Sequence, residues 1–221
     1  MPQTLNLFLT LRLSQDHHWI VGITLLILIF MLIIKWNKTN YFFSYVNSIY
    51  DMSFFNKKFS EKRRIELPEV FIFLSSLLGL SFFLYVVTDS SDFNITPYLQ
   101  IFLLLSIFLL SKYFIEKMAG DLFEIDPLIN KYLFFKQGIL SWISLFILFP
   151  FGLLIYFQNI DHTLSVTLVI ALVTVLYIVK LLSYALSYQK HILAYWFYFI
   201  LYLCAFEIAP YLILFKVFNT D

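Results

Sequence analysis

A carboxylate lies inside the last long apolar run of this sequence. Glu207 stands in YLCAFEIAPYLILFK, where helical spacing places Cys204 and Tyr211 on its face. A charged side chain at the centre of a membrane helix costs about 2.5–3.5 kcal/mol on insertion scales, so such a residue is a functional candidate. Pro210 lacks an amide proton and leaves the carbonyl of Phe206 without its usual donor. Two interpretations stay open: a site that binds a ligand or a proton, and a neutral carboxyl bonded to a neighbouring helix.

Lys180 is the second ionisable residue within an apolar run. At 1.5 Å per residue it lies roughly 14–16 Å from Glu207 in membrane depth, which excludes a direct ion pair. Its long stem lets the ammonium group extend to the nearer membrane surface. Thr174 and Tyr177 share its helical face, which indicates a polar seam against a neighbouring helix. The candidate intramembrane polar site therefore comprises Glu207, Cys204, Tyr211 and Lys180.

Metal binding and familiar catalytic chemistry have little support in the residue spacing. His17, His18 and His162 lie beside aspartates, and imidazole with carboxylate can bind zinc. No spacing matches a known metal motif, however, and polar caps on helix ends explain these residues, so we predict no metal and no cofactor. The single cysteine excludes an internal disulfide. Nucleotide-binding and hydrolase motifs are missing from the sequence, and a net charge of +1 offers no electrostatic case for nucleic acid.

The elements that must carry these residues are membrane helices. Of the 221 residues, 61% are hydrophobic and only 13% are charged, and the mean hydropathy is +0.84. A soluble fold of this size could not bury so much apolar surface, which excludes soluble enzymes and disordered proteins. We predict one all-α, multi-pass membrane domain over residues 1–221, a six-helix bundle. Its spans are expected at residues 19–36, 68–88, 97–115, 139–157, 165–184 and 192–216.

The basic residues predict the orientation of this bundle. With six spans, 13 of the 15 Lys and Arg residues fall on one face, the loops after the first, third and fifth spans. Basic loops stay on the cytoplasmic side. Both termini are therefore expected on the extracytoplasmic side of the membrane.

One or two further helices are expected to lie in the membrane surface. Between residues 41 and 59, apolar residues recur at helical spacing and precede the basic cluster Lys57, Lys58, Lys62, Arg63 and Arg64. This pattern favours a helix on anionic lipid, with a docking surface for a cytoplasmic partner as the alternative. A second surface helix is expected to begin at Asp126-Pro127, with Tyr132, Leu133 and Phe135 among the residues facing lipid. A helix break is expected in the fourth span around Pro150.

The segment FYFILYLCAFEIAPYLILFK resembles an uncharacterised family of bacterial integral membrane proteins, known as a domain of unknown function. The first span from Trp19, the segment LPEVFIFLSSLLGLSFFLYVV and the segment SKYFIEKMAGDLF resemble the same family. The resemblance implies a six-span helical protein of the bacterial inner membrane. It implies no activity, substrate or catalytic residue.

Two main hypotheses for function follow. Few catalytic groups, little glycine and abundant aromatic surface favour a non-enzymatic accessory or assembly subunit of a membrane complex. Its partners would be the lipid bilayer and another membrane protein or a second copy of the chain. The alternative is a small proton-coupled carrier or channel that uses Glu207. A membrane enzyme acting on lipid through the histidines is the weakest of the hypotheses.

Overall fold

The computed structural model describes residues 18–50, 54–55, 66–88, 95–122, 126–158 and 162–187, and its regular elements in these ranges are all helical. Five helical stretches are long and apolar enough to cross a membrane: His18–Asn37, Leu67–Thr88, Ile95–Met118, Asn130–Phe157 and Thr163–Tyr184. Each overlaps one of the first five predicted spans, and the fourth begins at Asn130 instead of residue 139. The sixth predicted span, residues 192–216, lies outside the described residues.

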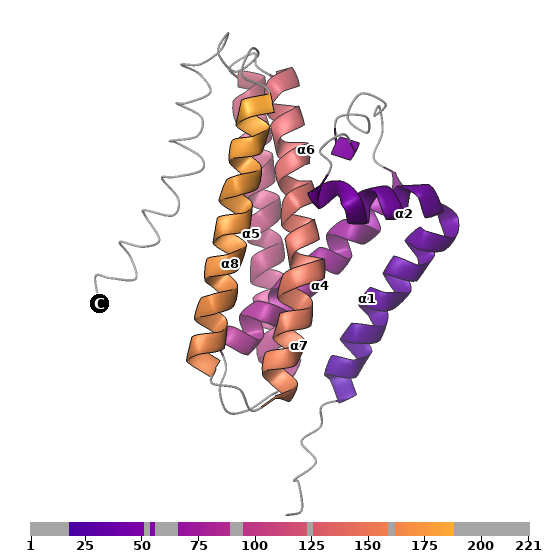
Figure 1. The fold of residues 1–221 in the computed structure, drawn as a ribbon, viewed down its shortest axis with the longest axis vertical. Helices are drawn as coiled ribbons and strands as arrows, with labels where there is room; N and C mark the ends of the chain where they lie inside the picture. The colour runs from indigo at the N-terminus through magenta and orange to yellow at the C-terminus, as the bar shows by residue number, and fades with distance from the viewer. Residues whose placement is uncertain are drawn as a thin grey trace, which may run out of the picture.

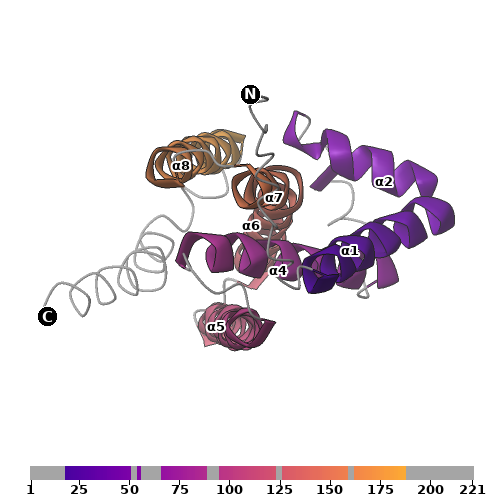
Figure 2. The same ribbon diagram turned by 90° about the horizontal axis from the view of Figure 1, so that it is seen from below.

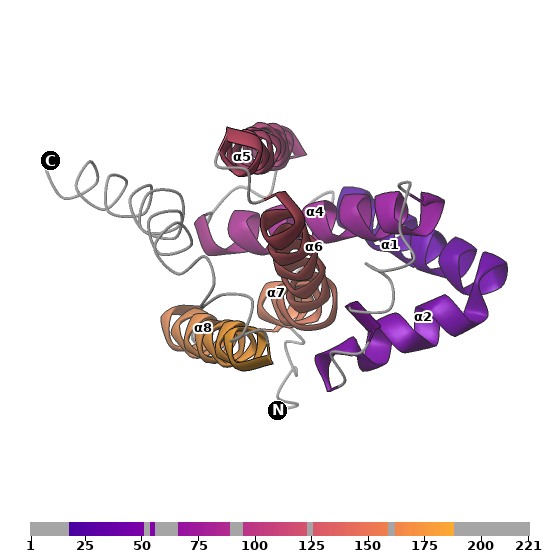
Figure 3. The ribbon, with the colours of Figure 1, turned by 90° about the horizontal axis from the view of Figure 1, so that it is seen from above.

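The long helix α4 (Leu67–Thr88) forms the centre of the bundle. Helix α5 (Ile95–Leu122) lies on one side of it, and α7 (Phe149–Phe157) and α8 (His162–Ser187) lie on the other (Figures 2 and 3). Helix α6 (Asp126–Ile143) contacts both α4 and α5, and α1 (His18–Asn37) runs along the free edge of α4 (Figure 2). Within the described part, 56% of the most apolar stretch of α4 is buried, against 6% for α5 and 11% for α8. The outer helices therefore present most of their surface to lipid or to other segments.

Small residues allow the neighbours of α4 to approach it closely. A Cβ on Gly79 would lie 3.1 Å from the Cβ of Phe149 and 3.4 Å from the carbonyl oxygen of Ser144. The hydroxyl of Ser144 donates to the carbonyl of Ser76 at 2.5 Å, and the hydroxyls of Ser76 and Ser141 lie 3.1 Å apart. Small side chains and interhelical hydrogen bonds of this kind hold membrane helices together where the hydrophobic effect cannot.

The fourth span is not broken at Pro150 as predicted, but the helix changes type just before it. Residues Ser144–Leu148 form a π-helical segment, η2, between α6 and α7, and the amide of Phe149 donates to the carbonyl of Ser144 five residues back. Pro150 follows directly and has no amide proton for the carbonyl four residues before it. The wider turn accommodates this missing bond without ending the helix.

The second predicted surface helix does begin at Asp126, but it is not a surface helix. It continues as α6 into the fourth span, and Tyr132, Leu133 and Phe135 are buried instead of facing lipid. The ring of Phe135 stacks on that of Tyr184 in α8, with centroids 4.5 Å apart. The expectation of lipid contact is wrong for these three residues because α8 and other parts of the chain cover the same apolar face.

The first predicted surface helix is present as α2 (Thr39–Val46), followed by the short helix η1 (Asn47–Ile49). Helix α2 turns sharply away from the end of α1 (Figure 1). Its aromatic side packs against the protein, since Tyr45 is only 2% exposed and the indole of Trp142 in α6 donates to the carbonyl of Val46 at 3.0 Å. Lipid contact is therefore wrong for Tyr45 and Ile49, which are buried. The basic cluster from Lys57 to Arg64 lies outside the described residues.

Candidate functional site

Most residues of the predicted sites fall outside the described part of the chain. Glu207, Cys204, Tyr211 and His17 belong to this group, so their roles stay predictions. His18 and His162 are the first residues of α1 and α8, and the side chain of His162 is not described. Among the described residues, no three His, Cys, Asp or Glu side chains gather closely enough to hold a metal ion.

Lys180 on α8 has a specific partner. Its ammonium group donates to the backbone carbonyl of Ile49 at the end of η1. A carbonyl at a helix end has no donor within its own helix, so a lysine supplies the missing bond with the added strength of a charge. The side chain thus extends toward the end of the bundle where α2 lies, and it ends on the protein. The hydroxyl of Thr174 bonds the carbonyl of Ile170 in its own helix at 2.7 Å, so that bond forms no seam with a neighbour.

A buried charge cluster lies between α5 and α6, and the sequence interpretation missed it. The Glu116 side chain is 3% exposed, and its Oε1 lies 2.8 Å from Nζ of Lys136 and 3.8 Å from Nζ of Lys112. The Lys136 ammonium also lies 5.6 Å from the centre of the Tyr132 ring. Glu116 was expected just beyond the third span, but α5 continues to Leu122. The four-residue spacing of Lys112 and Glu116 was the available signal.

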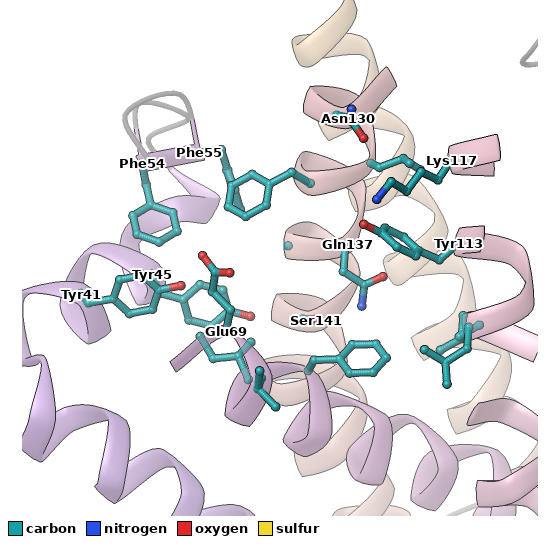
Figure 4. Close-up of a pocket in the computed structure, with 18 residues that line it drawn as sticks. Tyr41, Tyr45, Phe54, Phe55, Glu69, Tyr113, Lys117, Asn130, Gln137 and Ser141 are labelled. Carbon is teal, nitrogen blue, oxygen red and sulfur yellow. The ribbon is translucent and has the colours of Figure 1, made fainter. Parts of the chain in front are cut away.

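A cavity of about 580 Å³ opens between α2, the first turns of α4, the second half of α5 and α6. Figure 4 shows aromatic rings together with Glu69 on one wall, and Tyr113 together with the other polar side chains on the opposite wall. Most of its lining is apolar or aromatic, and the polar exceptions converge on it from all four elements. The polar and phenolic groups of this lining include Tyr41, Tyr45, Glu69, Lys117, Asn130 and Gln137.

Glu69 provides the acidic group of this cavity. Both of its carboxylate oxygens are shielded from solvent, and the carboxylate points into the space below Phe54 and Phe55 (Figure 4). Burial raises the pKa of the Tyr41 phenol, and the nearby charges of Glu69 and Glu66 raise it further. Glu69 was overlooked because it stands in the first turn of α4, where acids commonly stabilise helix ends.

The opposite wall carries the basic and amide groups. Tyr113 and Lys117 come from α5, while Asn130 and Gln137 come from α6 (Figure 4). In the part of the chain that the structure describes, Lys117 makes no hydrogen bond or ion pair. The cavity thus holds an acid on one wall and a base on the other, which is the arrangement that recognises a ligand with both charges.

A model of the family named "Domain of unknown function (DUF4271)" matches residues 20–218. The chain belongs to this family. The resemblance noted in the sequence is therefore confirmed at the level of a domain of unknown function, and the match includes both the cavity and the segment around Glu207. This DUF4271 chain has no significant match among curated proteins or among solved structures.

The aromatic wall of the DUF4271 cavity depends on one glycine. A Cβ at Gly138 of α6 would overlap the ring of Phe55. The glycine therefore lets this ring approach α6 closely, where it also meets Phe135 edge-on with centroids 5.3 Å apart. Phe55 is buried in this position. Phe55 and Gly138 both line the cavity, so this contact forms part of its wall.

Proposed function

We propose that this DUF4271 protein is a non-enzymatic accessory or assembly subunit of a complex in the bacterial inner membrane. The observation that carries the proposal is a mixed apolar and polar stripe on α5. We call it the outer face of α5: Gln100, Leu104, Ile107, Ser111, Ile115 and Met118, all exposed in the described part of the chain. The spacing of three to four residues places these six side chains on one side of the helix.

Two features of the outer face of α5 favour a protein partner over lipid. Gln100 and Ser111 make no hydrogen bond within the described residues, although both lie in a candidate span. A polar side chain in hydrocarbon gains by bonding to a neighbouring helix, and small residues such as serine permit close helix contact. Met118 is 69% exposed at the end of the span. A membrane helix of another protein would satisfy the polar groups and cover the apolar ones.

Photo-crosslinking in cells tests this proposal. A benzophenone side chain placed at Ile107 or Ile115 should give a crosslink to one distinct membrane protein. The matched controls are Leu25 and Leu32 of α1, which are similarly exposed at 53% and 60% and should crosslink only to lipid. A second pair of variants, Gln100→Leu and Ser111→Ile, should reduce the crosslink without lowering the amount of protein in the membrane.

Three results of the same experiment would contradict the proposal. A crosslink between two tagged copies of the chain would indicate a homo-oligomer instead of an accessory subunit. A crosslink within one chain would show that residues outside the described part cover this face. Equal crosslinking from α1 and α5 would show that the outer face of α5 has no special partner.

The predicted orientation, with both termini outside the cytoplasm, belongs to the same proposal. It is supported by the placement of lysines from several helices at one end of the bundle. Lys35 ends α1, Lys117 lies near the end of α5, and Lys131 lies near the start of α6. A reporter that is active only in the cytoplasm should be silent when fused at Asp221, and active when fused after α5. An active reporter at Asp221 would reverse the topology.

The alternative function, a proton-coupled carrier or channel using Glu207, stays a prediction. Replacing Glu207 by Gln should abolish activity and leave expression intact if protons pass through this carboxyl. Full complementation of a deletion strain by the Gln variant would exclude the proton role, because an amide replaces the hydrogen bonds of a neutral carboxyl but cannot release a proton.

A further inference from the structure

The cavity beside α2 lies at the depth where lipid headgroups meet the membrane. Its lining on α5 runs from Leu109 to Lys117, a rise of about 12 Å along the helix. The candidate span on this helix ends at Met118. On α4 the lining comes from Glu69 to Phe73, in the first turns of a helix that begins at Leu67. The cavity therefore extends from the membrane surface into the part of the hydrocarbon layer nearest that surface.

The rim of the cavity is open toward the membrane. Val70 of α4 and Leu110 and Tyr113 of α5 line the cavity and are also exposed. An apolar rim in the membrane admits acyl chains. Lys117 is also exposed, next to Met118 at the end of the candidate span, where a lipid headgroup would lie. The volume of about 580 Å³ is within the range of about 300–1,000 Å³ that small-molecule pockets occupy.

One wall of the cavity suits an ammonium group. Glu69 supplies a carboxylate, and the rings of Tyr41, Tyr45 and Phe54 stand around the same space (Figure 4). Aromatic faces attract cations, most strongly where water is excluded. The hydroxyl of Tyr45 is buried and makes no hydrogen bond within the described residues, so a ligand donor in the cavity would satisfy it.

The other wall suits a phosphate group. Lys117 supplies a positive charge, and the side-chain amides of Asn130 and Gln137 offer further donors. Hydrogen bonds from charged donors to phosphate oxygens are among the strongest in proteins. An anionic lipid without an ammonium group would fit this wall but would place no positive charge beside Glu69.

We propose that this cavity binds a zwitterionic phospholipid whose headgroup ends in a primary ammonium, with the phosphate at Lys117 and the ammonium at Glu69. The lipid comes from the surrounding leaflet, and its acyl chains leave past Val70 and Leu110. The proposal is independent of a partner on the outer face of α5, because the two surfaces share no residue.

Native mass spectrometry of the purified full-length chain tests the proposal. The protein is equilibrated in detergent with phosphatidylethanolamine, phosphatidylcholine or phosphatidylglycerol of equal chain length, and retained lipid is counted. The wild type should retain phosphatidylethanolamine about tenfold more strongly than the other two, as expected for one charge-assisted contact. Equal retention of all three lipids, or preference for phosphatidylglycerol, would overturn the proposal without any variant.

Two variants measure the contribution of each cavity wall to lipid binding separately. Glu69→Gln should remove the preference for phosphatidylethanolamine over phosphatidylcholine and leave the retention of phosphatidylcholine unchanged. Lys117→Gln should weaken retention of both lipids by about tenfold. The controls are Asp121→Asn on α5 and Lys35→Gln on α1, which lie outside the cavity and should behave as the wild type. Loss of retention in the controls, or unchanged selectivity in Glu69→Gln, would contradict the assignment.

Two further measurements keep the test decisive. Leu110→Trp places a bulky ring at the exposed rim and should abolish retention of all three lipids while the helical content stays that of the wild type. Soluble phosphoethanolamine should fail to displace the lipid, because it has no acyl chains to occupy the rim. Displacement at equal concentration would show that the cavity takes a free zwitterion, and retention in Leu110→Trp would show that lipid binds elsewhere.

Discussion

Glu116 and Glu69 are two shielded acids near the same end of the bundle, and the protein treats them differently. Glu116 lies between α5 and α6 with lysine Nζ atoms at 2.8 and 3.8 Å, so its charge is balanced within the protein. Glu69 lies on the wall of a cavity, with Lys117 on the wall across it (Figure 4). The first arrangement pins two helices together, and the second leaves space for a ligand between the charges.

This difference shows that burial alone does not identify an acid that binds a ligand. A buried ion pair with close geometry holds its neighbours in place, and removing one member is costly because it strands the other. An acid facing a cavity selects which ligand binds there, and it contributes less to the stability of the folded protein. The following predictions test whether these two roles are in fact separate.

The largest expected effect is the loss of stability when Glu116 is removed. Glu116→Leu removes the carboxylate that lies between Lys136 and Lys112, whose side chains are 12% and 14% exposed, and should lower the free energy of unfolding by about 3 kcal/mol. Glu69→Gln should lower it by less than about 1 kcal/mol, because the amide keeps the size and polarity of the side chain. Denaturant titration in micelles, followed by circular dichroism, measures both. Equal losses of unfolding free energy in the two variants would show that Glu116 and Glu69 do not have separate roles.

A smaller effect is expected when both charges of the closest pair are replaced. Glu116→Leu combined with Lys136→Met should be about 1–2 kcal/mol more stable than Glu116→Leu alone, because apolar side chains of similar size replace a buried pair at little cost. The same denaturant titration gives the comparison. A double variant less stable than the single one would mean that Lys136 has further stabilising contacts.

A substitution at Gly138 tests whether the packing of Phe55 shapes the cavity. Gly138→Ala forces a methyl group against the Phe55 ring and should cost about 1–3 kcal/mol as overpacking, and it should reduce lipid retention because the ring moves into the cavity. Gly22→Ala is the matched control, since a methyl group at Gly22 would meet nothing within 4 Å. The control should be neutral or slightly stabilising because alanine favours helix. Destabilisation of both variants to the same extent would rule out the Phe55 contact as the cause.

The smallest expected effect is a change in alkaline stability through Tyr41. Its pKa is raised above the ordinary value of 10.0 by burial and by the charges of Glu69 and Glu66. The unfolded chain therefore releases this proton at a lower pH than the folded chain, and the unfolding free energy falls as pH rises above about 10. Tyr41→Phe should flatten this part of the pH profile. Glu69→Gln should shift the Tyr41 pKa downward, whereas Glu116→Leu should leave it unchanged. An identical profile for the wild type and Tyr41→Phe would contradict the assignment.

Local features of the fold were predictable from the sequence. The first five spans follow from runs of apolar residues long enough to cross a bilayer. The start of α6 at Asp126 follows from an acid before proline, and the irregular helix before Pro150 follows from a missing amide proton. Each of these features depends on residues within a few positions of one another, so no knowledge of neighbouring helices is needed.

Only the tertiary structure decided what covers each apolar face. The sequence placed Tyr45 of α2 and Tyr132, Leu133 and Phe135 of α6 on apolar faces, but the structure assigns those faces to protein. Lipid tails and side chains are equally apolar, so hydrophobic periodicity cannot distinguish a face that meets lipid from one that meets a helix. The same holds for the acids: Glu116 meets Lys136 across 20 residues of sequence, and Glu69 faces a cavity lined by α2, α5 and α6. These contacts depend on how the helices pack together, which no local pattern specifies.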